Sequence, residues 1–264
     1  MSTAAPRVIA IGDVHGCVHA LEALIDEIAP TTDDRLVFLG DVVDHGRDTK
    51  EALELILALQ GRCRVTLIQG NHEEMMLAAR GDEAAMQFWM NCGGVATLNS
   101  YRFGARIGEA PPEHWALLQS CVPYFETHDT IFTHANYLPE APMDQQPGRQ
   151  LRWALFDPED ARPHVSGKTV VVGHTEQRSA ELVDLGFVVC IDTACWRYGW
   201  LTALERPSNH VWQASRWGRL RDPGEANHIE PLAAMLRKSP QAGERQLVEA
   251  GTSSAASPAR MAGK

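Results

Sequence analysis

Three short apolar runs near the start of the chain constrain its fold more than any other feature. Each run leads into a glycine followed by acidic, amide or imidazole side chains. Residues 9–11 precede Gly12-Asp13-Val14-His15-Gly16, residues 36–39 precede Gly40-Asp41-Val42-Val43-Asp44-His45-Gly46, and residues 65–68 lead to Gly70-Asn71-His72-Glu73. Short apolar runs bounded by glycine are typical of buried strands. The repetition predicts neighbouring strands whose ends share one site.

Amphipathic helices are predicted between these strands. Residues 17–29 place apolar side chains at helical spacing, and a second helix should follow Asp48 and end at Gly61. Asp48 and Glu51 have the spacing of a capping box. A third helix is expected over residues 73–79. Such strand–helix repeats predict right-handed crossovers and a parallel sheet, with the ligand site beyond the carboxyl ends of the strands.

The rest of the chain predicts further helices and then more strands. Helices are expected over residues 82–91, ending at Gly93-Gly94, and over 112–121. Strands are expected over 124–127, 130–133, 168–172, 181–183, 187–192, 200–205 and 211–214, the first two as a hairpin and the last four as successive antiparallel strands. Periodicity is lost after residue 222. We therefore expect a catalytic domain over residues 1–222 and a low-complexity, largely disordered tail over 223–264.

Charge and hydropathy exclude several classes of partner. The chain has 34 acidic and 24 basic side chains, a formal net charge of −10, which disfavours nucleic acid as a partner. No apolar run approaches the ~18 residues needed to span a bilayer, so no membrane association is expected. The start of the chain does not resemble a secretory leader. These features predict a cytoplasmic protein whose six cysteines are reduced.

Six candidate metal ligands follow the predicted strands: Asp13, His15, Asp41, Asn71, His134 and His174. Carboxylate and imidazole ligands together suit transition metals such as manganese, iron or zinc. Six ligands are too many for one catalytic ion that keeps open positions, but they fit two ions that share a carboxylate. The glycines beside these ligands would let the backbone turn sharply and crowd around the ions.

The motifs, together with His134-Ala135 and Gly173-His174, resemble the signature of the phosphoprotein phosphatase family of calcineurin-like metallophosphoesterases, in its bacterial serine/threonine phosphatase-like branch. The resemblance covers about residues 8–205. It implies an α/β fold in which a metallophosphoesterase β-sandwich is flanked by helices (α/β/β/α). N-terminal parallel βαβ units would be followed by antiparallel strands.

The resemblance also implies roles for single residues. Asp13, His15 and Asp41 would hold the first metal ion, and Asp41, Asn71, His134 and His174 the second, with Mn²⁺ as the favoured ion and Fe or Zn²⁺ as alternatives. His72 would be the general acid, oriented by Asp44. The implied reaction is hydrolysis of phosphomonoesters by in-line attack of metal-bound hydroxide. The implied substrates are phosphoserine or phosphothreonine in proteins, or a small phosphoester.

One position departs from the family pattern. His45 stands where the family has an arginine that grips the phosphate, and histidine lacks the permanent charge and bidentate fork of arginine. We expect His45, Arg47, Arg152 and Asn71 to contact the phosphate group. The acidic pairs Asp33-Asp34 and Glu73-Glu74 are expected to be solvated, with Glu73 also favourable at a helix N-terminus. The tryptophans near the last strands are expected to serve in core or rim packing.

Two alternatives remain open at the level of the sequence. Related phosphatases hydrolyse dinucleoside polyphosphates, so an Ap4A-type hydrolase is one alternative. The loss of arginine at position 45 suggests the other, a metal-binding pseudophosphatase without turnover. The sequence does not select an oligomeric state.

Overall fold

The computed structural model describes residues 6–222, so the predicted tail over residues 223–264 lies outside the described part of the chain. The strands are β1 (Val8–Ile11), β2 (Arg35–Phe38), β3 (Arg64–Leu67), β4 (Tyr124–Glu126), β5 (Thr130–Thr133), β6 (Thr169–Val172), β7 (Val183–Asp184), β8 (Val188–Cys190), β9 (Trp200–Arg206) and β10 (Val211–Ser215). The helices are α1 (Val18–Ile28), α2 (Thr49–Leu59), α3 (Asn71–Ala78), α4 (Glu83–Trp89), α5 (Val95–Tyr101), α6 (Pro112–Gln119) and α7 (Gly148–Trp153).

The strands form two sheets, in the orders β10-β9-β1-β2-β3 and β4-β5-β6-β8-β7. In the first sheet β1, β2 and β3 are parallel, while β9 pairs antiparallel with both β1 and β10. In the second, β5, β6 and β8 are parallel and the edge strands β4 and β7 are antiparallel. The predicted α/β fold, with N-terminal parallel βαβ units in a helix-flanked sandwich, is confirmed.

One detail of the predicted topology is wrong. The strands from residue 181 to residue 214 do not form a single antiparallel run, because β8 pairs parallel with β6 and β9 belongs to the other sheet. The chain crosses between the sheets after Cys190. This crossing brings residues 191–199 to the same end of the sandwich as the predicted metal ligands.

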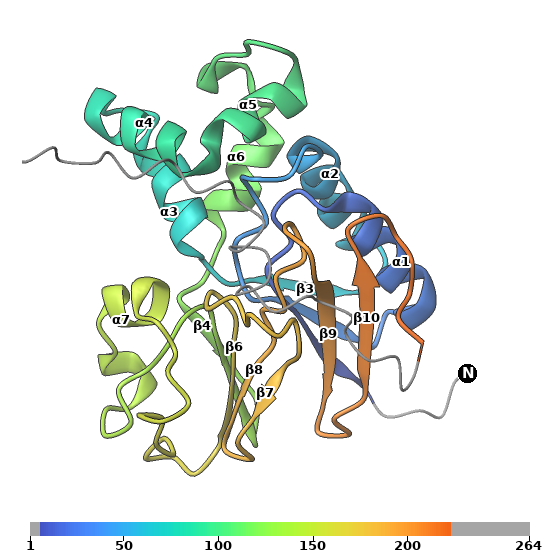
Figure 1. Ribbon diagram of the computed structural model, residues 1–264, viewed down its shortest axis with the longest axis vertical. Coiled ribbons are helices and arrows are strands. Elements are labelled where there is room, and N and C mark those ends of the chain that lie inside the picture. Colours follow the sequence, from blue (N-terminus) through green and yellow to red (C-terminus); the bar gives the residue numbers. More distant parts are fainter. Residues whose placement is uncertain (1–5, 223–264) are drawn as a thin grey trace, which may run out of the picture. The chain divides into compact units, whose positions relative to one another are not determined.

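Alternating side chains on the strands build three apolar layers. Ile9 and Ile11 of β1 face a cluster shared with α1 and α2, whereas Ala10 faces a cluster between the sheets. In β6, Val171 faces the layer between the sheets, and its neighbours pack in a third cluster with Leu151 of α7. Strands that are buried on both faces have apolar side chains at almost every position, so their sequences are continuous apolar runs. In Figure 1, α1 and α7 accordingly lie on opposite sides of the strands.

The helical segment after α3 is longer than predicted. Asp82 caps α4 as expected, since its carboxylate accepts a hydrogen bond of 2.6 Å from the Ala85 N–H. The chain does not stop at Gly93-Gly94 but passes through a π-helical turn (Met90–Gly94) into α5. Gly93 has a φ of +110°, and a Cβ on Gly94 would lie 2.5 Å from the Trp89 ring. The two glycines therefore kink the helix and let Trp89 pack, rather than end it.

Helix starts show one further difference from the prediction. Asp48 occupies the N-cap position of α2, but its side chain makes no capping hydrogen bond, so the predicted capping box is wrong.

In Figure 1, α3 to α6 group together beyond the ends of the strands. None of the helices within residues 6–222 is long and apolar enough to cross a membrane.

Candidate metal centre and active site

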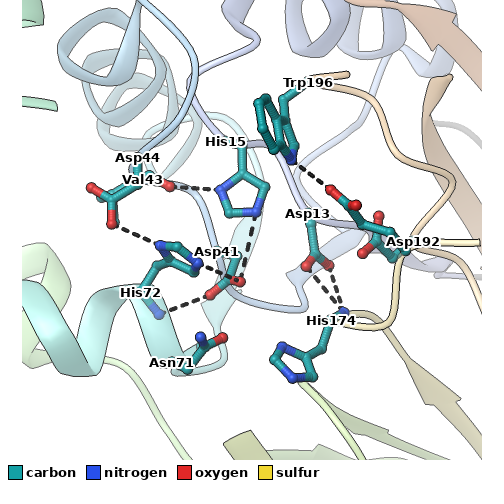
Figure 2. Close-up of polar contacts among 12 residues, drawn as sticks. Asp13, His15, Asp41, Val43, Asp44, Asn71, His72, His174, Asp192 and Trp196 are labelled. Atoms are coloured by element: carbon teal, nitrogen blue, oxygen red, sulfur yellow. Dashed lines mark hydrogen bonds and ion pairs between the residues drawn. The ribbon is translucent and has the colours of Figure 1, made fainter. Parts of the chain in front are cut away.

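The predicted metal ligands, together with His72 and Asp44, gather where strands of both sheets end (Figure 2). β1, β2 and β3 lead to the three N-terminal motifs, and β5 and β6 lead to His134 and His174. His15, Asp41 and His174 have positive φ values of 44°, 50° and 62°, a region that non-glycine residues rarely adopt. Strained backbone of this kind clusters at functional sites.

The first group of candidate ligands is Asp13, His15 and Asp41, whose ligand atoms lie within 4.8 Å of one another. The Nδ1 of His15 lies 2.8 Å from the Val43 carbonyl oxygen and donates to it. Its Nε2 therefore carries the lone pair and faces the Asp41 Oδ2 at 3.7 Å. Burial lowers the pKa of His15 to about 3. A neutral imidazole held by a backbone carbonyl in this way is the usual state of a metal-binding histidine.

The second group is Asp41, His134 and His174, again within 4.8 Å. The Nδ1 of His134 lies 3.0 Å from the Leu39 carbonyl oxygen. Its Nε2 faces two more acceptors, the Asn71 Oδ1 at 3.0 Å and the Asp41 Oδ2 at 3.4 Å. A nitrogen among oxygen acceptors needs a proton or a cation on it. Asp41 is common to both groups, as a bridging ligand would be.

The charge of the cluster fits bound cations. Asp13 and Asp41 are 4% and 2% exposed, and Asp192 after β8 is 4% exposed. Burial, together with the nearby Asp192 and Asp41 carboxylates, raises the pKa of Asp13 well above its usual range. Buried carboxylates so close to one another are costly unless a cation compensates them. The donor set of carboxylate, amide and imidazole therefore fits divalent transition-metal ions.

Close packing of the backbone confirms the predicted need for glycine in these turns. A Cβ on Gly70 would overlap the Asp41 carboxylate, and one on Gly173 would overlap the Asp13 carboxylate. Gly40 has a φ of +109°, and its added Cβ would meet the Gly70 nitrogen at 2.6 Å. At Gly40, Gly70 and Gly173 the backbone therefore lies too close to its neighbours to leave room for a side chain.

His72 and Asp44 form a buried pair beside this cluster. The His72 Nδ1 lies 2.7 Å from the Asp44 Oδ2. Although burial disfavours the charged imidazole, the Asp41 and Asp44 carboxylates raise the pKa of His72 to about 9. Asp44 is fixed in turn by Trp89, whose Nε1–H donates at 2.9 Å, and by the Thr97 hydroxyl at 2.7 Å. The pair can therefore hold a proton on His72 Nε2 at neutral pH.

The carboxylate of Glu73 organises the loop of the second motif, contrary to the prediction that it is solvated. Glu73 is fully buried and accepts hydrogen bonds from four backbone N–H groups. They belong to Asp41 and Val42 (both 2.8 Å), Gly70 (3.0 Å) and Val43 (3.3 Å). A glutamate three residues after the glycine that precedes α3 is the sequence signal of such an N-terminal cap. The same correction applies to Asp34, which is 3% exposed and pairs with Arg7 at 2.7 Å.

His45 lies at the site and is stacked on Trp196. The two rings are 4.2 Å apart and nearly parallel, with an interplanar angle of 6°. The His45 ring is also 4.8 Å from that of His15 and 5.0 Å from that of His72. The Trp196 Nε1–H donates to Glu176 at 2.6 Å, and the Arg197 guanidinium lies 4.5 Å from the Trp196 ring centre. Trp196 packs partly buried against the core, as predicted, and in addition stacks on His45 at the site.

The two predicted phosphate-binding arginines lie outside the candidate ligand groups. Arg47 is exposed at the end of the second motif and belongs to none of the candidate ligand groups. The Arg152 Nη2 donates to the Glu74 Oε1 at 2.7 Å, and the same carboxylate accepts from the Trp153 Nε1–H at 2.5 Å. Their contact with phosphate stays a prediction.

Comparison with known proteins agrees with this geometry. The chain matches the calcineurin-like phosphoesterase family over residues 6–191. It is 30% identical to serine/threonine-protein phosphatase 1 of Salmonella typhimurium over 203 residues, which cover 73% of this chain and 88% of that protein. It is 46% identical to the symmetrical bis(5'-nucleosyl)-tetraphosphatase of Erwinia tasmaniensis over 70 residues, which cover 26% of this chain and 24% of that protein. The match to the tetraphosphatase of Pseudomonas fluorescens, at 27% identity, spans 47% of this chain and 52% of that protein.

Solved structures show the same fold. A serine/threonine phosphatase from Saccharomyces cerevisiae superposes with a TM-score of 0.56 at 16% identity, covering 88% of this chain and 84% of that one. A cold-active protein-tyrosine phosphatase from a Shewanella species superposes with a TM-score of 0.54 at 17% identity, covering 83% and 80%. The family match over residues 6–191, together with 30% identity to the Salmonella phosphatase over 73% of this chain, shows that this chain belongs to the calcineurin-like phosphoesterase family.

Proposed function

We propose that this chain is a dinuclear metal-dependent phosphatase that hydrolyses phosphomonoesters, with phosphoserine and phosphothreonine residues of proteins as its substrates. The observation that carries the proposal is the pairing of His72 with Asp44, at 2.7 Å, directly beside Asp41. The His72 Nε2 is 3.9 Å from the Asp41 Oδ2. A proton donor is therefore held next to the residue that both candidate metal sites share.

In this proposal Asp13, His15 and Asp41 hold one divalent ion, and Asp41, Asn71, His134 and His174 hold the other. Mn²⁺ is the proposed ion, and Fe or Zn²⁺ are the alternatives. Divalent ions bound there would polarise the phosphoryl group and lower the pKa of water, so that hydroxide is available near neutral pH. The backbone carbonyls of Val43 and Leu39 hold the His15 and His134 rings in the orientation that ligation requires.

His72 supplies the proton that the leaving oxygen needs. Its Nδ1–H is engaged by Asp44, so the proton on Nε2 is the one that can be transferred. Trp89 and Thr97 keep Asp44 in place through donated hydrogen bonds. The Asp44 carboxylate stabilises the imidazolium before transfer, and a water molecule can restore the proton afterwards.

The phosphate group is proposed to contact His45, Asn71, Arg47 and Arg152. His45 and Asn71 support this role by their position, because both lie among the candidate ligands and His72. To reach the phosphate, Arg152 would have to leave its ion pair with Glu74, and the exposed Arg47 would have to turn its guanidinium toward the site. The similarity to the Salmonella phosphatase along most of both chains supports protein phosphate as the substrate class.

Hydrolysis of a dinucleoside tetraphosphate is the second candidate. The higher local identity to the Erwinia tetraphosphatase, 46% over 70 residues, favours it. The test compares a phosphoserine peptide, an aryl phosphate and a dinucleoside tetraphosphate with Mn²⁺-loaded protein. We expect turnover of the peptide and the aryl ester. Turnover of the tetraphosphate alone would refute the protein-phosphatase proposal.

Two variants separate an active enzyme from a pseudophosphatase. We expect His72→Asn to lower kcat for the phosphopeptide by roughly 10²–10⁴-fold, the usual range for losing a general acid, with an unchanged metal content by mass spectrometry. His128→Asn, on the surface, is the matched control. If the unaltered protein binds two metal ions and hydrolyses none of the esters, it is a pseudophosphatase. In that case the variant His45→Arg tests why the protein is inactive. Restored turnover would show that the missing arginine is the reason.

A further inference from the structure

A cavity of about 580 Å³ lies beside His45, and its lining includes none of the six predicted metal ligands. Its lining comes from two parts of the chain, the end of the second motif and the kink between α4 and α5. The lining residues are His45, Arg47, Gly93, Val95, Ala96 and Asn99. A volume of this size falls in the range of small-molecule pockets.

The cavity adjoins the proposed proton donor. His45 lines the cavity, and its ring centre is 5.0 Å from that of His72. Gly93 allows the opposite wall to come close, since an added Cβ would lie 2.8 Å from the His45 Nδ1. Trp196 stacks on the His45 ring at 4.2 Å and fixes its plane. The cavity therefore begins one side chain away from the group that protonates the leaving oxygen.

The lining combines an apolar wall with a cationic rim. Gly93, Val95 and Ala96 offer carbon surface. Arg47 is exposed, and within residues 6–222 its guanidinium takes part in none of the hydrogen bonds or ion pairs. A guanidinium at the rim of an apolar pocket attracts and orients carboxylate or phosphate groups. Its place in the cavity lining puts Arg47 within reach of a substituent on the leaving group, which is an alternative to the phosphate contact proposed for it above.

We propose that this cavity binds the leaving group of the substrate and favours phosphoesters whose leaving group has a bulky apolar body with an anionic substituent that pairs with Arg47. The inference rests on the proposed phosphoesterase function and adds a substrate preference to it. Ala96 and Arg47 are the residues that set this preference. Ala96 controls the room for the apolar body, and Arg47 recognises the anionic substituent.

The test uses three substrates with metal-loaded protein: ethyl phosphate, 2-naphthyl phosphate and 6-phosphonooxy-2-naphthoate. Ala96→Phe fills the cavity from α5, and Asn99→Phe fills it from the next turn of the same helix. We expect each variant to lower the ratio of kcat/KM for naphthyl over ethyl phosphate by at least about tenfold, the scale of discrimination by an apolar pocket. Ala84→Phe, on the exposed face of α4, should leave the ratio unchanged. A ratio unchanged in both filling variants would overturn the inference.

The role of Arg47 is tested by the added carboxylate. Arg47→Ala should lower the ratio of kcat/KM for the naphthoate ester over the naphthyl ester by about tenfold, the loss expected when one charge-assisted pair is removed. Arg62→Ala, an exposed arginine outside the cavity, is the control. If Arg47→Ala lowers kcat/KM for all three esters equally, Arg47 grips the transferred phosphate and the inference is wrong.

A binding measurement separates this inference from the proposed function. The product alcohol 6-hydroxy-2-naphthoate is titrated against each variant and followed by its fluorescence. We expect Ala96→Phe and Arg47→Ala each to weaken binding about tenfold relative to the unaltered protein. Equal binding to all variants overturns the cavity inference even if the esters are hydrolysed. Variant-dependent binding without turnover of any ester refutes the proposed function and leaves the cavity inference standing.

Discussion

The substitution Glu73→Gln tests the proposal that one buried carboxylate holds the loop that carries Asp41. The change keeps the size of the side chain but removes its charge and one of its two acceptor oxygens. In the structure Oε2 accepts from the N–H groups of Asp41 and Gly70, whereas Oε1 accepts from those of Val42 and Val43. A glutamine oxygen can replace only one of these oxygens. Its NH₂ group then faces backbone N–H donors.

The expected cost follows from the contacts that are lost. If the amide oxygen keeps the Asp41 and Gly70 contacts, the Val42 N–H loses a 2.8 Å bond and becomes an unsatisfied buried donor, and the Val43 N–H loses a weaker contact of 3.3 Å. An unsatisfied buried donor costs about 1–3 kcal/mol. The two remaining bonds lose their charge assistance, which roughly halves each of them and adds about 1 kcal/mol. We therefore expect Glu73→Gln to lower the free energy of unfolding by about 2–4 kcal/mol.

The assay is urea unfolding of metal-free protein, followed by metal content after reconstitution. Because Glu73 positions the Asp41 backbone, the variant should also bind less metal per chain. Glu74→Gln is the matched control, since Glu74 is partly exposed and bonds only Arg152 and Trp153. It should cost about 1 kcal/mol or less. A Glu73→Gln variant that is as stable as the control and binds metal normally would refute the role assigned to this carboxylate.

Three further predictions concern stability and catalysis. Burial opposes the charged form of Asp34, but hydrogen bonds from Arg7 and Thr31 hold its pKa below the usual range. The ionised carboxylate therefore adds to the free energy of unfolding above pH ~4, and this stabilisation is lost as the pH falls. Asp34→Asn should therefore cost about 1–2 kcal/mol at pH 7, and the difference should shrink between pH 4 and pH 2 in urea unfolding. Trp89→Phe removes a charge-assisted hydrogen bond to the Asp44 carboxylate worth about 1.5–3 kcal/mol, so kcat should fall roughly ten- to a hundredfold with KM unchanged; a change in KM alone would contradict a positioning role. Removing divalent ions present at about 100 times their dissociation constant should lower Tm by about 5–10 °C in thermal unfolding, whereas an unchanged Tm would contradict metal binding by the native cluster.

The predictions that were confirmed rest on local patterns. The strand before Gly40 and the helix over residues 18–28 could be predicted, because the spacing of apolar residues and the placing of glycine and proline determine local structure within a few positions. The convergence of the ligands followed from the parallel arrangement of the strands, since their carboxyl ends meet at one edge. His72 and Asp44 could be paired only through the family resemblance, because 27 residues lie between them along the chain.

The predictions that were wrong depend on contacts between distant segments. The sequence around β8 and β9 does not indicate which sheet each strand joins, because both sheets offer apolar faces. Glu73 looks like a surface residue at a helix start until the loop of the second motif folds over it. The kink at Gly93 likewise follows from packing of the Trp89 ring and not from helix propensity. In each case tertiary packing outweighs the local preference.

The surroundings of His45 suggest why the chain can lack an arginine there. Burial and the nearby His72 lower the pKa of His45 to about 4, so its ring is neutral at pH 7 and provides no permanent charge for phosphate. Its stacking on Trp196 and its close approach to Gly93 instead make it a rigid wall between the proposed acid and the cavity. Charge compensation of the phosphate would then fall to the metal ions, His72 and the proposed arginine contacts. Substrate selection would depend more on the leaving group, where an apolar wall and Arg47 supply the contacts.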